Sequence, residues 1–228
     1  MATPGQLVKC IAEALGIPEP TVVQYDRLLA ENDLRSKGGR GTSAAKVTAV
    51  DAANLLIAIM GSPVAGASIK PAIETCKTYG GLRVRLGANS ETVKTFRRLG
   101  FPTMSKLPKS HSFREGLASL ISAASVGESL VIPDEDGRPP LVGPANDWFV
   151  ELRLEGPTPW AHIMVDASLG EARPGEMARL VYHNLKRDRD GGYWAPAKAG
   201  NLHQSRSVDF KAIRRIGALL GQQPPKAT

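Results

Sequence analysis

Residues 6–60 read QLVKCIAEALGIPEPTVVQYDRLLAENDLRSKGGRGTSAAKVTAVDAANLLIAIM. Apolar side chains at positions 7, 11 and 15 recur every fourth residue, which predicts a helix that ends at Gly16. Pro18 and Pro20 predict a tight turn, because proline lacks the N–H that a helix interior needs. Thr21 is then the expected N-cap of a second helix. The stretch therefore predicts two short helices joined by a tight turn.

The second predicted helix has an apolar side, formed by Val22, Tyr25 and Leu29, and a polar side. Asp26 and Glu31 lie on or beside the polar side and repel phosphate, so only the first part of this helix is expected to approach a duplex. Threonine and glutamine hydrogen-bond base edges, and arginine binds guanine or phosphate. An alternative is an ordinary surface helix in an all-helical hairpin. The predicted DNA contacts on this helix are Thr21, Gln24 and Arg27.

A basic, glycine-rich segment follows the second helix. Gly38, Gly39 and Gly41 let the backbone turn sharply, so that neighbouring cations can approach a polyanion. The segment is therefore expected to contact phosphate, and the alternative is a solvated linker. Asp51 is the expected N-cap of a third helix with its own apolar stripe. The predicted DNA contacts of the segment are Arg35, Lys37, Arg40 and Lys46.

The run from Ala14 to Ile59 resembles the DNA-binding domain of MerR-type regulators. In that family a glycine-bounded turn precedes a T-[VI]-R-x-Y-E-like helix, a basic wing and a D-x-x-x-L-x-x-I helix. The chain departs from the pattern at Gln24 and in the wing, where Arg40 stands between glycines. The resemblance implies a winged helix-turn-helix fold and a DNA surface, but neither metal sensing nor promoter untwisting, since no long dimerisation helix with cysteine ligands follows. The matching positions are Thr21, Val22, Tyr25, Leu34, Arg35, Asp51, Leu55 and Ile59.

Positive charge is concentrated in the first half of the chain. Residues 1–110 hold 15 lysines and arginines against eight acidic residues, whereas residues 111–228 hold 14 of each kind. A basic part beside a neutral part favours nucleic acid as the partner. No apolar run suits a membrane span or a signal peptide, and Cys10 and Cys76 form no CxxC pair. We therefore expect a cytoplasmic protein with no membrane partner, disulfide framework or zinc site.

Residues 65–110 are expected to form a basic αβ extension that ends in a linker over 104–112. The pattern predicts a helix over 70–78, a half-buried strand over 82–86 and a further helix over 90–99. Alternation along the strand places both of its arginines on one face. These elements form a second predicted backbone-contacting surface, with a solvated face of a small αβ unit as the alternative. Its cations are Arg83, Arg85, Arg97 and Arg98.

Residues 111–228 are predicted to form an α+β domain around a β-hairpin. The hairpin consists of WFVELRL and WAHIMVDA, in which apolar residues alternate with polar ones on each side of a short turn. The predicted elements are a helix over 113–124, strands over 129–134, 148–154, 160–167 and 179–183, and a closing helix over 208–220 capped by Ser207 or Asp209.

Acidic and histidine side chains fall on or beside these strands. Such a group can bind a metal or transfer protons, but the solvated face of a hairpin produces the same pattern. No nucleophile elbow, phosphate-binding loop or metal-binding histidine pair accompanies it. We therefore predict no catalytic residue, metal or cofactor, and a metal-dependent enzyme acting on nucleic acid is the alternative. The residues concerned are Glu151, Glu155, His162, Asp166 and His183.

The sequence thus predicts a sequence-specific double-stranded DNA-binding protein, a transcriptional regulator. Residues 1–64 are expected to form the mainly helical winged helix-turn-helix, residues 65–110 the basic extension, and residues 111–228 a small antiparallel sheet with packed helices. The last part is assigned to self-association, a protein partner or an effector. A homodimer is expected, because one short helix reads only a few base pairs. A phage-type DNA-packaging subunit is an alternative, and it would form a large ring.

Overall fold

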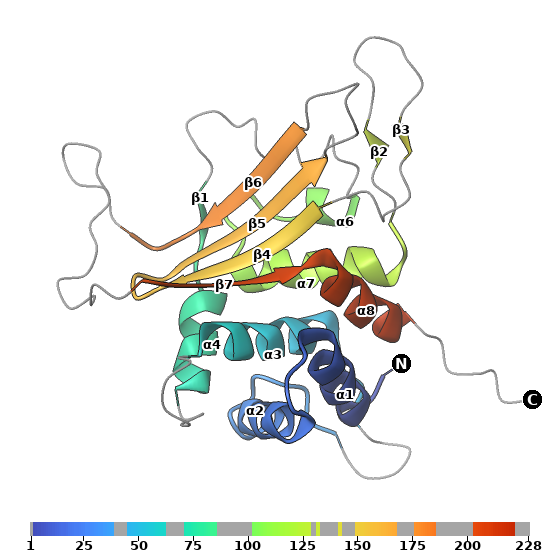
Figure 1. Ribbon diagram of the computed structural model, residues 1–228, viewed down its shortest axis with the longest axis vertical. Coiled ribbons are helices and arrows are strands. Elements are labelled where there is room, and N and C mark those ends of the chain that lie inside the picture. Colours follow the sequence, from blue (N-terminus) through green and yellow to red (C-terminus); the bar gives the residue numbers. More distant parts are fainter. Residues whose placement is uncertain are drawn as a thin grey trace, which may run out of the picture.

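Figure 1 shows the protein as a computed structural model in which an antiparallel sheet packs on a layer of helices. The α+β class predicted from the sequence is confirmed. Below one face of the sheet lie the helices α3 (Ala49–Gly61), α7 (Phe113–Ser125) and α8 (Phe210–Gly221), and the two N-terminal helices lie beyond α3. The structure describes residues 2–38, 45–62, 71–85, 102–128, 131–132, 141–142, 149–167, 176–185 and 203–221.

The remaining elements complete these two layers. The further helices are α1 (Pro4–Leu15), α2 (Glu19–Glu31), α4 (Ala72–Gly80) and α6 (Pro102–Ser105). The main sheet has the order β1-β6-β5-β4-β7, with every neighbouring pair antiparallel. Its strands are β1 (Val84–Arg85), β4 (Phe149–Gly156), β5 (Trp160–Ala167), β6 (Glu176–Tyr182) and β7 (Gln204–Asp209), and a separate pair is formed by β2 (Val131–Ile132) and β3 (Leu141–Val142).

Two short helices joined by a tight turn, α1 and α2, form as predicted, but the second helix begins earlier. Gly16 ends α1 in the left-handed conformation that glycine adopts without strain. The prediction that Thr21 caps α2 is wrong, because the helix starts at Glu19 with Pro18 as its N-cap. Pro20 fits inside the first turn, where backbone N–H groups have no acceptor within the helix and proline loses nothing.

The third helix, α3, is the centre of the molecule. Thr48 is its N-cap, so the prediction of Asp51 in that role is wrong by three residues. Asp51 instead closes a capping box, in which its carboxylate accepts from the Thr48 N–H at 2.7 Å. Every residue from Asp51 to Met60 is buried, because the other helices and the sheet surround α3. The sequence predicts one apolar stripe on this helix, whereas in the structure residues 51–60 are buried on every side of it.

The predicted hairpin is confirmed as β4 and β5, with Leu152 opposite Ile163. Leu152, Leu154 and Ile163 are buried, and Ile163 faces the helices, because its Cδ1 lies 3.4 Å from the position of a Cβ atom at Gly116 on α7. On the opposite face the same strands carry polar side chains, as the alternation predicts. The strand predicted over 179–183 is β6, which begins three residues earlier and pairs with β5.

One strand of the sheet, β7, has no counterpart among the predictions. It pairs with β4, placing Val208 opposite Leu152, and runs directly into α8. Its sequence, QSRSVD, alternates weakly because only Val208 is buried. The predicted capping role of Asp209 is confirmed, since its carboxylate accepts from the Ala212 N–H at 3.2 Å.

Four further predicted elements, at residues 70–78, 82–86, 90–99 and 129–134, have different outcomes. The helix predicted over 70–78 is α4, displaced by two residues, and the strand predicted over 82–86 is described only at Val84–Arg85. Part of the strand predicted over 129–134 is β2. The helix predicted over 90–99 lies outside the described residues.

The predicted linker, residues 104–112, packs against the rest of the protein. Met104 and His111 are buried, and Nε2 of His111 lies 2.9 Å from the Tyr182 hydroxyl on β6. Buried hydrophobic residues from Ala2 to Ile216 form one cluster that includes both halves of the chain. None of the helices in the described segments combines the length and apolar character that crossing a membrane requires.

Candidate nucleic-acid interface

The outward side of α2 carries the residues predicted to read DNA. Val22 and Leu29 are fully buried, which fixes the rotation of the helix about its axis. That rotation leaves Gln24 and Arg27 exposed and Thr21 half-buried. The three therefore form one polar row along α2, one helical turn apart at each step.

Two of the predicted DNA-binding cations form exposed ion pairs. Arg27 Nε lies 3.1 Å from Glu31 Oε1, with side chains 80% and 54% exposed. Lys37 Nζ lies 2.6 Å from Asp33 Oδ1, again at the surface. Exposed pairs of this kind contribute about 0–1 kcal/mol, so either cation can exchange its carboxylate for a phosphate at little cost.

Arg35 lies in a different environment, because its side chain is only 15% exposed. Its Nε is 2.9 Å from Oδ1 of Asp26, which is also buried, and the contact is ionic because neither atom forms a directed hydrogen bond. Burial raises the pKa of Asp26 above its ordinary value, while the Arg35 guanidinium acts in the opposite direction. The prediction that Asp26 lies on or beside the polar side of α2, where it would repel phosphate, is therefore wrong. Arg35 joins the start of the basic segment to α2.

The rest of the basic segment is described only at its two ends. Lys46 is exposed beside Val47, whose N–H donates to Ala2 O at 3.0 Å and so holds this end of the segment next to the start of α1. Arg40 lies outside the described residues, as do Arg97 and Arg98 of the second predicted surface.

The other two cations of that second surface, Arg83 and Arg85, lie at the edge of the sheet. Both are exposed while Val84 between them is buried, as the alternation predicts. Arg83 Nη1 donates to Ser110 O at 3.0 Å, and Arg85 Nε donates to His183 O at 3.2 Å. Strand β1 and helix α2 lie on opposite sides of the helical layer (Figure 1), so these arginines and the α2 row do not form one surface.

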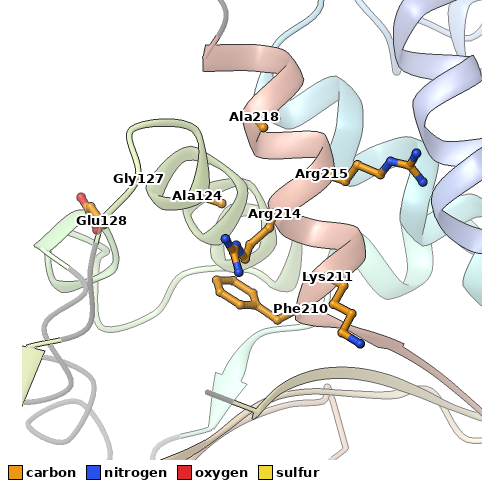
Figure 2. A pocket seen from close by; sticks show the side chains of 8 residues that line it. All are labelled: Ala124, Gly127, Glu128, Phe210, Lys211, Arg214, Arg215 and Ala218. Carbon is orange, nitrogen blue, oxygen red and sulfur yellow. The ribbon is translucent and has the colours of Figure 1, made fainter. Parts of the chain in front are cut away.

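A basic pocket between α7 and α8 is absent from the predictions. It has a volume of about 540 Å³ and lies between the C-terminal end of α7 and the exposed side of α8. Figure 2 shows the Arg214 guanidinium beside the Phe210 ring and Arg215 directed away toward α1, where Glu13 lies 3.1 Å from its Nη2. The net charge of residues 111–228 is zero, so the count of charges along the sequence does not reveal this local group of cations. The pocket is lined by Ala124, Gly127, Glu128, Phe210, Lys211, Arg214, Arg215 and Ala218.

The acid-histidine group lies on the outer face of the sheet. Nε2 of buried His162 is 3.5 Å from Glu155 Oε1, and the Trp160 ring lies 4.5 Å from the His183 ring. Glu151 pairs instead with Arg153 at 2.9 Å. The described residues include no group of three side chains that could hold a metal ion, and the side chain of Asp166 is outside what the structure describes.

His162 is expected to make the protein sensitive to acid. Burial lowers its pKa to about 4, and the Arg179 guanidinium adds to the shift while donating to Nδ1 at 3.2 Å. The unfolded chain takes up this proton near pH 6.5, so stability present above that pH is lost as the pH falls toward 4. The loss reaches about 3 kcal/mol. Urea unfolding from pH 7 to pH 4 checks it, and His162→Gln should unfold with a shallower pH dependence. Equal acid sensitivity in both proteins would assign the effect to other groups, among them buried His111.

Comparison of the chain with protein-family models, with curated proteins and with solved structures finds no match in any of the three. The interpretation of the α2 row therefore depends on its own geometry and chemistry.

Proposed function

We propose that this protein binds double-stranded DNA through α2 and the basic segment that follows it, as a winged helix-turn-helix. One observation carries the proposal. The apolar side of α2 is fully packed, and the opposite side presents Gln24 and Arg27 to solvent. A helix that follows a tight turn and exposes such a row suits the major groove, where glutamine pairs with adenine and arginine with guanine.

The charges around α2 suit phosphate contact at the ends of the row. Arg27 and Lys37 are held only by exposed carboxylates, and Lys46 is exposed at the far end of the segment. Glu31 and Asp33 oppose close approach of the C-terminal end of α2, so DNA would meet the first turns of the helix. We further propose that the protein is a cytoplasmic transcriptional regulator that acts as a homodimer, because paired helices double the contacts.

Replacing Lys37 or Arg40 by glutamine is expected to weaken binding to all duplex sequences. Each lost phosphate contact should reduce the slope of log K against log salt by about 0.9. Fluorescence anisotropy with a labelled genomic fragment, at salt concentrations from about 50 to 200 mM, tests this prediction. Lys106→Gln removes the same charge from an exposed position near α6 and should leave the slope unchanged.

The same measurement separates this proposal from its competitors. Gln24→Ala should reduce the preference for one sequence over another while leaving the salt slope intact, and Arg27→Ala should reduce the same preference. Binding that is insensitive to salt, or unaffected by the α2 and segment variants, would refute the DNA interface. Slopes changed instead by Arg83→Gln or Arg85→Gln would place the duplex at the sheet edge. A solution mass of two chains supports the regulator, and a large ring supports a packaging subunit.

A further inference from the structure

The Arg114 side chain, near the start of α7, lacks a counterion. Its Nη2 donates to Cys76 O at the long distance of 3.5 Å, and its Nε is buried without a hydrogen-bond partner. No carboxylate in the described segments lies within ion-pair distance of it. A guanidinium has five N–H donors and stays charged in proteins, so partial burial without an anion is costly.

The guanidinium of Arg114 lies close against the backbone of Gly80, at the end of α4. A methyl group at Gly80 would come within 2.9 Å of Nη2 and 3.1 Å of Nε, so the guanidinium would have to shift to make room for it. The absence of a side chain at this glycine therefore lets the planar group lie there. Packing therefore fixes the direction of the Arg114 guanidinium before an anion binds. This favours binding, because the side chain loses less conformational freedom when the anion is bound.

A pocket of about 420 Å³ opens beside Arg114, between α3, α7 and the segment after α2. Its own carboxylates are already occupied. Asp51 accepts from the backbone N–H and hydroxyl groups of both Ser36 and Thr48, at 2.7 to 3.2 Å, and Asp33 pairs with Lys37. Nδ2 of Asn54 donates to Leu34 O at 2.7 Å. The pocket thus contains a positioned cation but no free anion for it among the described residues.

We propose that this pocket binds a small polar molecule through a carboxylate or phosphate group that contacts Arg114. Both groups accept two parallel hydrogen bonds from a guanidinium, which matches the planar fork. The volume suits a small metabolite. Lys37, exposed at the rim, reaches the same anion by leaving Asp33. The proposal stands on these contacts and does not depend on DNA binding.

The test is an NMR titration of the ¹⁵N-labelled full chain with inorganic phosphate and, separately, with acetate at constant ionic strength. We expect saturable shifts of the Ser36 and Asn54 signals. Arg114→Gln should weaken binding at least tenfold, and Gly80→Ala should do the same by displacing the guanidinium while keeping its charge. Lys211→Gln removes one cation from the α8 pocket of Figure 2 and should change the affinity less than twofold.

Each outcome of the titration decides the proposal. Saturation by phosphate alone or by acetate alone supports it and identifies the anionic group. Absence of saturation with both anions refutes it, as does unchanged affinity in Arg114→Gln. Loss of binding in Lys211→Gln refutes it too, because the anion would then lie between α7 and α8. Should Arg114→Gln not fold, Arg114→Lys keeps the charge without the planar fork and Gly80→Ala keeps the arginine, and unchanged affinity in both would overturn the proposal.

Discussion

Asp51→Ala is expected to lower the free energy of unfolding by about 2 to 3 kcal/mol, because one buried carboxylate accepts hydrogen bonds from both Ser36 and Thr48, on the chain before α3. The carboxylate accepts from Ser36 N at 2.7 Å and from Thr48 N at 2.7 Å, as well as from both hydroxyls. Alanine leaves these donors to water and removes the capping box of the central helix. Urea unfolding measures the change.

The matched control is Asp33→Asn, in the same segment. Asp33 is 82% exposed, forms an ion pair with Lys37 and has a positive φ of 57°, which asparagine also tolerates, so this change should alter the stability by less than about 0.5 kcal/mol. Proteolysis should also cut the Asp51→Ala variant faster within 34–48, since Ser36 and Thr48 lose their hydrogen bonds to α3. Equal stability of the two variants would show that the hydrogen bonds to Asp51 are no stronger than those to water.

Gly116→Ala is expected to destabilise the protein by about 2 to 3 kcal/mol, although alanine is the better helix former. Gly116 is the fourth residue of α7, and a methyl group there overlaps the Tyr182 hydroxyl and comes within 3.1 Å of its ring. Tyr182 is fully buried and cannot move aside, because its hydroxyl is held by His111 at 2.9 Å and its ring packs edge-on against Phe113. Thermal or urea unfolding measures the loss.

Two further variants separate this overlap from other effects. Gly5→Ala places the same methyl group on α1 with nothing within 4 Å, so it should stabilise the protein by up to about 1 kcal/mol. Tyr182→Phe removes the overlapping atom but leaves His111 without its partner. The double variant Gly116→Ala/Tyr182→Phe should therefore cost less than the two single changes together. Additive costs would contradict a direct overlap.

Local sequence signals correctly predicted those helices and strands whose ends are determined by capping or turn residues close in the chain. The helix α7 begins where Ser112 and Glu115 form a capping box, and it ends within one residue of the predicted position. The hairpin of β4 and β5 follows from alternation across a short turn, and Gly16 and Asp209 perform their predicted roles. These features depend on contacts within a few residues, so the sequence pattern contains the information they need.

The candidate interface was predicted only in its exposed part. Gln24 and Arg27 face solvent because helical periodicity decides the two sides of α2. The pairing of Arg35 with Asp26 was missed, since the separation of the two residues along the chain does not reveal which buried charge meets which. The position of Arg83 and Arg85 on the far side of the helical layer also depends on how β1 joins the sheet.

The sequence by itself determined the α+β class, the two short helices and tight turn near the N-terminus and the polar row on α2, because periodicity and capping act over one or two helical turns. Only the tertiary structure decided that α3 is buried on all sides, that the weakly patterned strand β7 joins β4, and that Arg114 lies against Gly80 beside a pocket. Each of these outcomes joins residues that are distant in the chain. Such contacts are selected by the packing of the whole core, which no local pattern contains.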